Sequence, residues 1–132
     1  MISSIRIQWS EQEPIIEVVD TEELERALDH IEHHLNTEQP TIVFVEAHGY
    51  RIALGLGCKE SFVQLESESG EPPYLVTIGD ASATGVAAFY LFENHYTEIP
   101  RCNLIPATKA REVLIETIQT AIRPTCVEWK EI

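Results

Sequence analysis

The sequence predicts an α+β fold in which a single, mostly antiparallel sheet carries two helices packed on one face. Two segments with helical periodicity lie near the ends of the chain, at 20–35 and 106–121. Between them, from Thr41 to about Glu93, short strand-like runs are separated by turn residues. Consecutive strands with brief connections favour an antiparallel meander over a β–α–β array. The length of 132 residues fits one domain, 1–132.

Two extended segments are predicted ahead of the first helix. Ile5, Ile7 and Trp9 alternate with polar residues, which is the pattern of a half-buried strand. The run 14–19 is a second extended segment and a candidate hairpin partner for the first.

The first helix has a defined beginning, apolar side and end. Asp20 and Thr21 open it, and Glu23 follows Asp20 at the spacing of a capping box. Asn36 and Pro40 mark its end. Its apolar residues recur at helical spacing; they are Leu24, Ala27, Leu28, Ile31 and Leu35.

Five strands are predicted between the helices: Thr41–Ala47, Arg51–Gly57, Phe62–Glu68, Tyr74–Gly79 and Val86–Glu93. The short connection at 48–50 suits a hairpin, and Gly70-Glu71-Pro72-Pro73 is a turn signal. A loop at 80–84 precedes the fifth strand. Helices on one face of this sheet leave the other face open to water or to a partner.

The second helix is predicted to begin at Pro106, since proline is tolerated in the first turn. Arg123-Pro124 ends it, and 125–130 is a closing strand. The apolar side of the helix is formed by Ala110, Val113, Leu114, Ile118 and Ala121.

The chain is strongly acidic. It has 22 Asp and Glu against nine Lys and Arg, a formal net charge of −13. This charge repels nucleic acid and anionic membranes, so neither is an expected partner. It favours solubility and fast encounter with a basic protein, although acidity is also common among bacterial cytoplasmic proteins. Without a signal-like N-terminus or a long apolar segment, the expected location is the cytoplasm.

Residues that bear chemistry are present without a specific motif. Cys58, Cys102 and Cys126 show no CxxC spacing, so no zinc knuckle is predicted. His30 and His34 have a spacing that can place two imidazoles on one metal, but histidines on the flank and back of a helix's apolar stripe are more often a solvated polar face than a metal site.

A nucleophilic site is one further possibility. Cys102 can be paired with His95 and with Glu93 or Asp80, but a small buried thiol is the alternative. No phosphate loop is present, because Gly55-Leu56-Gly57 lies in a strand with no helix after it. We therefore expect no enzyme activity, no cofactor and no metal.

The candidate partner-binding residues are acidic residues and tyrosines in the second half of the chain. Carboxylates provide steering, and tyrosines provide contact area at low entropic cost. Gln64 and Glu66 are predicted to share the face without helices; a solvated sheet face is the alternative. The candidates are Glu66, Glu68, Glu71, Tyr74, Asp80, Glu93, Tyr96 and Glu98.

Residues 70–132 also carry a family pattern. Its pieces, in order, are Gly70-Glu71-Pro72-Pro73-Tyr74-Leu75-Val76-Thr77-Ile78-Gly79-Asp80, Val86–Phe92, Asn103-Leu104-Ile105-Pro106, Ala110, Arg123-Pro124 and Val127-Glu128-Trp129. This pattern resembles an immunity-protein family of bacterial polymorphic toxin systems, often encoded beside nucleic-acid deaminase toxins. The first half agrees only in its layout of strand, helix and strands.

The resemblance implies a cytoplasmic protein, a monomer or weak homodimer, that binds a basic toxin domain and blocks its active site. The shared residues have structural reasons of their own: Pro106 starts a helix, Pro124 ends it, and Trp129 anchors a strand. The pattern therefore does not locate the interface. A small acidic secretion chaperone, which holds a partly unfolded client, is the alternative binding function.

Overall fold

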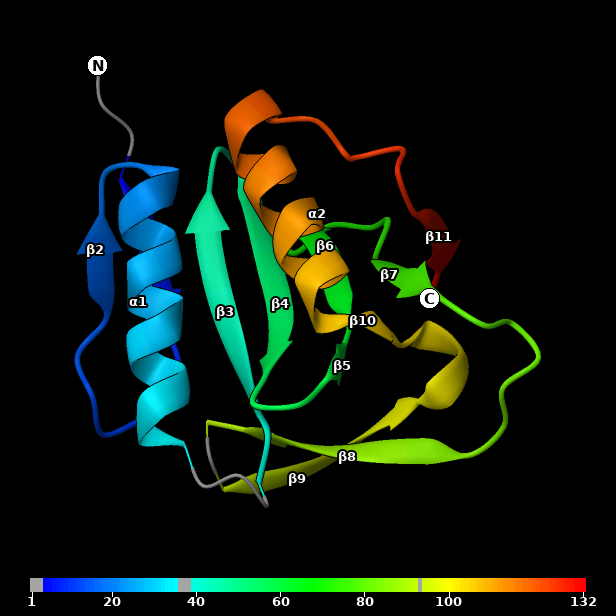
Figure 1. Ribbon diagram of the computed structural model, residues 1–132. Helices are drawn as coiled ribbons and strands as arrows, with labels where there is room; N and C mark the ends of the chain where they lie inside the picture. Colours follow the sequence, from blue (N-terminus) through cyan, green and yellow to red (C-terminus); the bar gives the residue numbers. More distant parts are fainter. Residues whose placement is uncertain (1–3, 36–38, 93) are drawn as a thin grey trace.

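The structure is a computed structural model that describes residues 4–35, 39–92 and 94–132. It confirms the α+β fold class, with two helices over a mostly antiparallel sheet (Figure 1). Its elements are β1 (Ile5–Gln8), β2 (Ile16–Val18), α1 (Thr21–His34), β3 (Thr41–Ala47), β4 (Tyr50–Leu56), β5 (Glu60–Ser61), β6 (Val63–Ser67), β7 (Leu75–Ile78), β8 (Val86–Leu91), β9 (His95–Pro100), the 3₁₀ turn η1 (Arg101–Asn103), β10 (Ile105–Pro106), α2 (Ala107–Thr120) and β11 (Glu128–Glu131).

The main sheet has the strand order β11-β7-β6-β4-β3-β1-β2, and all neighbours in this series are antiparallel. The predicted hairpin of the first two strands is confirmed, with Ile5 opposite Val18. The first four strands of the predicted meander are also confirmed as β3, β4, β6 and β7. The closing strand pairs with β7, which places Trp129 opposite Thr77.

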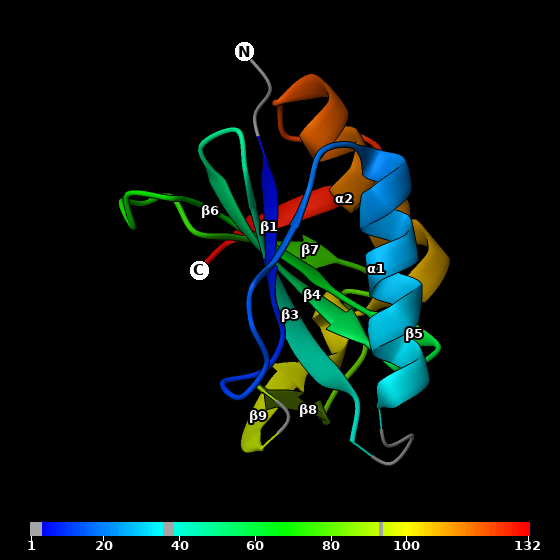
Figure 2. The same ribbon diagram turned by 90° about the vertical axis from the view of Figure 1, so that its left-hand side faces the viewer.

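Both helices cover the same face of the sheet, as Figures 1 and 2 show. Leu28 of α1 and Leu114 of α2 are fully buried in one cluster with strand residues such as Val45 and Ile52. Arg111 joins the helices, because its guanidinium contacts carboxylates of α1, Asp29 at 2.8 Å and Glu32 at 3.3 Å. The helices therefore form one layer over the sheet.

The helix starts follow the sequence closely, whereas α2 ends at Thr120, ahead of the predicted stop at Arg123-Pro124. The Asp20 side chain accepts a hydrogen bond of 2.8 Å from the Glu23 backbone N–H, so the predicted cap is confirmed. The helix α1 ends at His34, and the predicted stop residue Asn36 lies outside the described residues. The second helix begins at Ala107, with Pro106 as its cap.

The fifth predicted strand pairs differently from a meander. Strand β8 pairs in parallel with Thr41 and Ile42 at the start of β3, and antiparallel with β9, which the sequence analysis did not predict. The physical reason is an open edge on β3. Strand β1 pairs only with the β3 stretch Phe44–Glu46, so the start of β3 is available to another strand.

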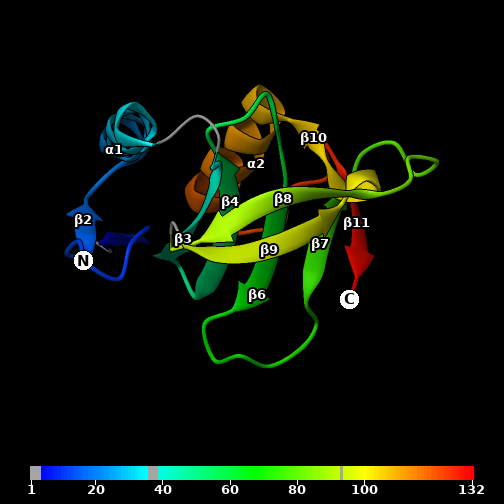
Figure 3. The same cartoon turned by 90° about the horizontal axis from the view of Figure 1, so that it is seen from below.

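The β8–β9 hairpin covers part of the face that was expected to be open. The hairpin lies at the lower end of the sheet in Figure 1, and Figure 3, seen from below, shows it crossing the sheet at that end. Phe89 and Ile99 are buried in a second apolar cluster with residues of the main sheet, and Phe89 meets Phe62 edge-to-face at 5.3 Å. Gly55 makes room for this packing, because a Cβ there would lie 2.6 Å from the Phe89 ring. The open face is therefore smaller than predicted.

The residues of the family pattern hold the β7, η1 and β11 region together. The Thr77 hydroxyl donates to the Asn103 carbonyl at 3.0 Å, and the Asn103 amide donates to the Thr77 carbonyl at 3.2 Å. At Gly79 a Cβ would lie 1.8 Å from the Leu104 carbonyl oxygen. The Trp129 indole donates to the Pro124 carbonyl at 2.8 Å. These contacts are internal to the fold.

Candidate protein-binding surfaces

The predicted contact residues fall on separate parts of the molecule. Glu66 lies in β6, and Glu68, Glu71 and Tyr74 lie in the connection to β7. Tyr96 and Glu98 lie in β9, Asp80 follows β7, and Glu93 lies outside the described residues.

These candidates form two larger groups at opposite ends of the sheet. One group lies in β6 and the β6–β7 connection, and the other lies in the β8–β9 hairpin. The β6–β7 connection starts beside Tyr50, whereas the hairpin pairs with Thr41. Along the strands these ends are roughly 20 Å apart, at about 3.3 Å per residue. Figure 2 shows the hairpin at the bottom and the β6–β7 connection projecting higher up, away from the helices.

Several residues of the β6–β7 group are already engaged within the protein. Glu66 shares the face without helices with Gln64, as predicted, and its carboxylate lies 3.5 Å from the Arg51 guanidinium. The Tyr74 hydroxyl donates to the Gly70 carbonyl, and the ring is half-buried. Glu68 and Glu71 are exposed. This group therefore presents two exposed carboxylates and no exposed tyrosine.

A groove of about 520 Å³, here called the β6–α2 groove, lies beside this group. It separates β6 and β7 from the segment after α2, and Ile122 in that segment is 66% exposed. Arg123 adds a positive charge to the lining. The sequence analysis missed Ile122; its signal was an apolar residue directly after the helix. The lining residues are Tyr50, Leu65, Glu66, Ser67, Glu71, Pro73, Leu75, Ile122, Arg123 and Thr125.

The β8–β9 hairpin has one buried side and one outer side. Phe89 and Ile99 point into the second cluster. Because side chains alternate along a strand, the intervening residues point outward. Three cross-strand pairs make up this outer surface, here called the hairpin face: Val86 with Pro100, Ala88 with Glu98, and Tyr90 with Tyr96.

The hairpin face combines apolar contact area with one carboxylate. Tyr96 is 59% exposed and Val86 is 43% exposed. The Tyr96 ring meets the Tyr90 ring edge-on at 5.9 Å, and its hydroxyl donates to Glu98 at 3.1 Å. The hydrogen bond and the charge of Glu98 raise the pKa of Tyr96, so the phenol stays protonated at neutral pH. The sequence analysis named Tyr96 and Glu98 but missed Val86 and Tyr90.

Asp80 stands apart from both surfaces. Its carboxylate accepts hydrogen bonds from the Ser82 hydroxyl at 2.6 Å and from the Ser82 backbone N–H at 3.0 Å. These two bonds lower the pKa of Asp80. The carboxylate is thus ionised at neutral pH and orders the turn after β7.

The rest of the open sheet face carries a row of alternating charges across five strands. Glu17, Arg6, Glu46, Arg51 and Glu66 are neighbours in register from β2 to β6. Opposite charges on neighbouring strands support each other and stay hydrated. This row holds three carboxylates and two guanidinium groups in alternation, so most of its charge is compensated within the row.

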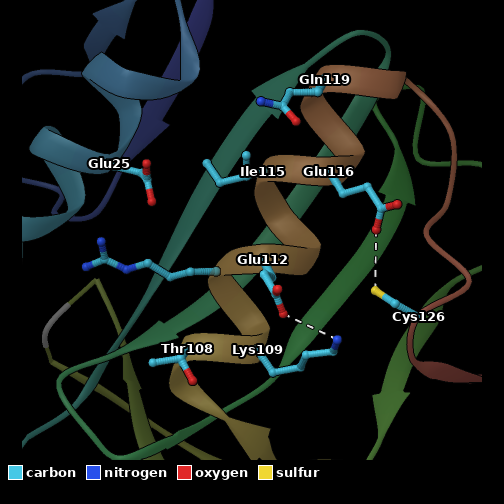
Figure 4. A pocket seen from close by; sticks show the side chains of 9 residues that line it. Glu25, Thr108, Lys109, Glu112, Ile115, Glu116, Gln119 and Cys126 are labelled. Carbon is cyan, nitrogen blue, oxygen red and sulfur yellow. Dashed lines mark hydrogen bonds and ion pairs between the residues drawn. The ribbon is translucent and has the colours of Figure 1, made fainter.

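Figure 4 shows a hollow of about 450 Å³ along α2, lined by residues that contact one another. Lys109 contacts Glu112 at 3.3 Å, and the Cys126 thiol donates to Glu116 at 3.3 Å. Partial desolvation and this hydrogen bond raise the pKa of Cys126, so the thiol form prevails at neutral pH. A protonated thiol is a poor nucleophile.

The other candidates for chemistry do not converge. His95 begins β9 and contacts Glu11 at 3.2 Å, whereas Cys102 lies beyond the far end of that strand. His30 and His34 are adjacent, with ring centroids 4.4 Å apart, and the backbone carbonyl of His30 lies 2.8 Å from His34 Nδ1. The described residues contain no cluster of three metal-ligating side chains. In the same residues, no helix has the length and apolar character needed to cross a membrane.

A family model described as "Immunity protein Imm1" matches residues 12–131. The match places the chain in the class of immunity proteins, whose partners are toxins. Within that class the chain belongs to the Imm1 family. The match extends well beyond residues 70–132, where the resemblance was first apparent. No curated protein matches the chain.

Proposed function

We propose that this immunity protein acts in the cytoplasm, where it binds a cognate secreted bacterial toxin and blocks the active site of that toxin in a one-to-one complex. The observation that carries the proposal is the family match over residues 12–131. The proposed action is binding and not catalysis; the candidate nucleophilic pair, His95 and Cys102, is separated by the length of β9.

The toxin that fits best acts on nucleic acid, as a deaminase or nuclease does. Such a toxin needs a basic groove for phosphates. A protein with a net charge of −13 can occupy that groove in place of the substrate. A stable complex of this kind buries about 800 Å² on each partner. The candidate contact residues predicted from the sequence lie on two separate surfaces, the β6–β7 connection and the hairpin face, and at Asp80; the toxin-binding surface is one of these candidates.

The test is co-expression with the toxin domain encoded beside its gene. We expect growth to be rescued and the two proteins to co-purify as a stable one-to-one complex. Addition of the nucleic-acid substrate in excess should slow complex formation, because the protein and the substrate compete for one groove. A catalytically inactive toxin variant serves as the control that folds without killing the host.

A secretion chaperone predicts a different outcome. It would dimerise and hold the toxin in a partly unfolded state, so the bound toxin would show little protection of its amide hydrogens from exchange. A folded toxin in the complex supports neutralisation. Absence of rescue and of a complex, with both proteins folded, would overturn the proposal.

A further inference from the structure

We propose that the hairpin face is the surface that docks on the toxin, and that its occupant is a basic patch of the toxin with an arginine or lysine held between Tyr96 and Glu98. This inference rests on the function proposed above and adds the location and chemistry of the contact. Its residues are Val86, Ala88, Tyr90, Tyr96, Glu98 and Pro100.

The first support is an uncovered apolar surface on a regular strand pair. Tyr96 and Val86 are both exposed, and Ala88 and Tyr90, which are half-buried, lie between them in the register. The other exposed large apolar residues in the described chain lie outside the helices and strands; these are Ile15, Val19, Ile122 and Ile132. Contiguous apolar area of this kind marks a contact surface more often than isolated side chains do.

The second support is that the hairpin is anchored to the sheet on its buried side. Phe89 and Ile99 are buried on the other side of the hairpin. The Tyr90 backbone N–H donates to the Pro40 carbonyl at 2.8 Å, and the Thr41 hydroxyl donates to the Tyr90 carbonyl at 2.7 Å. The backbone that carries the outer side chains is therefore fixed before a partner arrives, which reduces the entropic cost of binding.

The third support is the chemistry at Tyr96. Its ring offers a face for a cation, and the Glu98 carboxylate lies within hydrogen-bond distance of its hydroxyl. A carboxylate has room for more donors than this one hydroxyl, so it can also receive a guanidinium or ammonium group. A cation seated here gains a cation–π contact and an ion pair at once.

The net charge of the chain favours a basic partner over a second copy of the chain. Glu98 is the only charged residue among the six of the hairpin face, and Arg101 lies beyond its end with its side chain over Gly85. Two copies of a chain with a charge of −13 would repel each other.

The experiment compares two hairpin variants, Tyr96→Ala and Glu98→Lys, with the matched charge reversal Glu71→Lys at the β6–α2 groove. The equilibrium affinity for the co-expressed, catalytically inactive toxin domain is measured by calorimetry or surface plasmon resonance. We expect each hairpin variant to lose about 30-fold or more in affinity, as residues at the centre of an interface do. Glu71→Lys should stay within about threefold of wild type. Circular dichroism and thermal unfolding verify that each variant is folded.

Three results overturn the inference. Hairpin variants that bind within about threefold of wild type place the contact elsewhere, while the proposed function stands. A loss for Glu71→Lys equal to that of the hairpin variants also excludes the hairpin face as the principal contact. A change from dimer to monomer in free Tyr96→Ala, by light scattering, assigns the face to a second copy. If wild type itself neither binds nor rescues growth, the proposed function fails first.

Discussion

The structure changes the pKa of Asp80 through a single neighbouring residue. Both hydrogen bonds to the Asp80 carboxylate come from Ser82. The side-chain bond is the larger cause of its lowered pKa. We predict that Ser82→Ala raises the pKa of Asp80 toward the ordinary aspartate value, with the backbone bond preserving part of the shift. An NMR titration of the Asp80 carboxyl carbon measures this directly.

The sign of the associated pH effect follows from linkage. A carboxyl group whose pKa is lower in the folded state contributes stability above its unfolded-state pKa and loses it as the pH falls through the folded-state pKa. The stability of Ser82→Ala should therefore approach that of wild type in strong acid and differ more above the unfolded-state pKa of Asp80. Ser69→Ala, in the β6–β7 connection, is the control and should leave the Asp80 midpoint unchanged. An unchanged midpoint in Ser82→Ala would contradict the assignment.

For single residues, the sequence predicts the direction of a side chain better than it predicts the residue that the side chain contacts. The side of β6 on which Gln64 and Glu66 lie follows from the two-residue period of a strand. The partner of Glu66 does not, because Arg51 lies 15 residues earlier and reaches it only through the β4–β6 register. For the same reason no local pattern indicates that the Tyr74 hydroxyl is bound internally to Gly70.

Among the elements, the β8–β9 hairpin is held by its inner side and free on its outer side. Phe89 is 1% exposed and packs on Phe62, whereas Tyr96 is exposed. We predict that Phe89→Ala lowers the free energy of unfolding by about 3–5 kcal/mol, since it leaves a cavity between the hairpin and the sheet. Tyr96→Ala, the matched change on the outer side, should cost less than about 1 kcal/mol. Urea unfolding measures both.

Equal losses for the two variants would contradict the inner and outer assignment of the hairpin, and with it the register of β8 and β9. The comparison also supports the binding experiment. A variant of Tyr96 that unfolds like wild type but binds weakly has lost contact area and not structure.

The hairpin also shows where prediction from sequence stops. Four strands of the meander were predictable because each short connection joins neighbours. The position of β8 depends instead on the length of β1, which ends its pairing at Phe44 and leaves the start of β3 open. Strand β9 was missed since its inward residues, such as Thr97 and Ile99, are interspersed with polar and proline residues. For this reason the sequence identified Tyr96 and Glu98 of the hairpin face but not Val86 and Tyr90.

Over the whole molecule, several of the basic residues form ion pairs with carboxylates of the same chain. Arg111 bridges two carboxylates of α1, Arg51 pairs with Glu66, and Arg26 pairs with Glu22. Each ion pair neutralises a carboxylate as well as a cation, so the excess of acidic residues, 22 against nine basic ones, is set by the composition. The net charge of −13 is thus available to act at long range on an approaching partner.

The long-range field of the acidic surface predicts that association with the toxin depends on salt. We expect the association rate constant with the toxin to fall about tenfold or more between low salt and roughly 0.5 M salt, because ions screen charges beyond a few ångströms. The dissociation rate constant should change much less, since contacts already formed at the hairpin face are short-ranged. Stopped-flow or surface plasmon resonance over a salt series separates the two rates. Glu98→Gln should reduce the slope only slightly, because it removes one of many charges, while it raises the dissociation rate. An association rate that does not respond to salt would show that the acidic surface does not act by resembling nucleic acid.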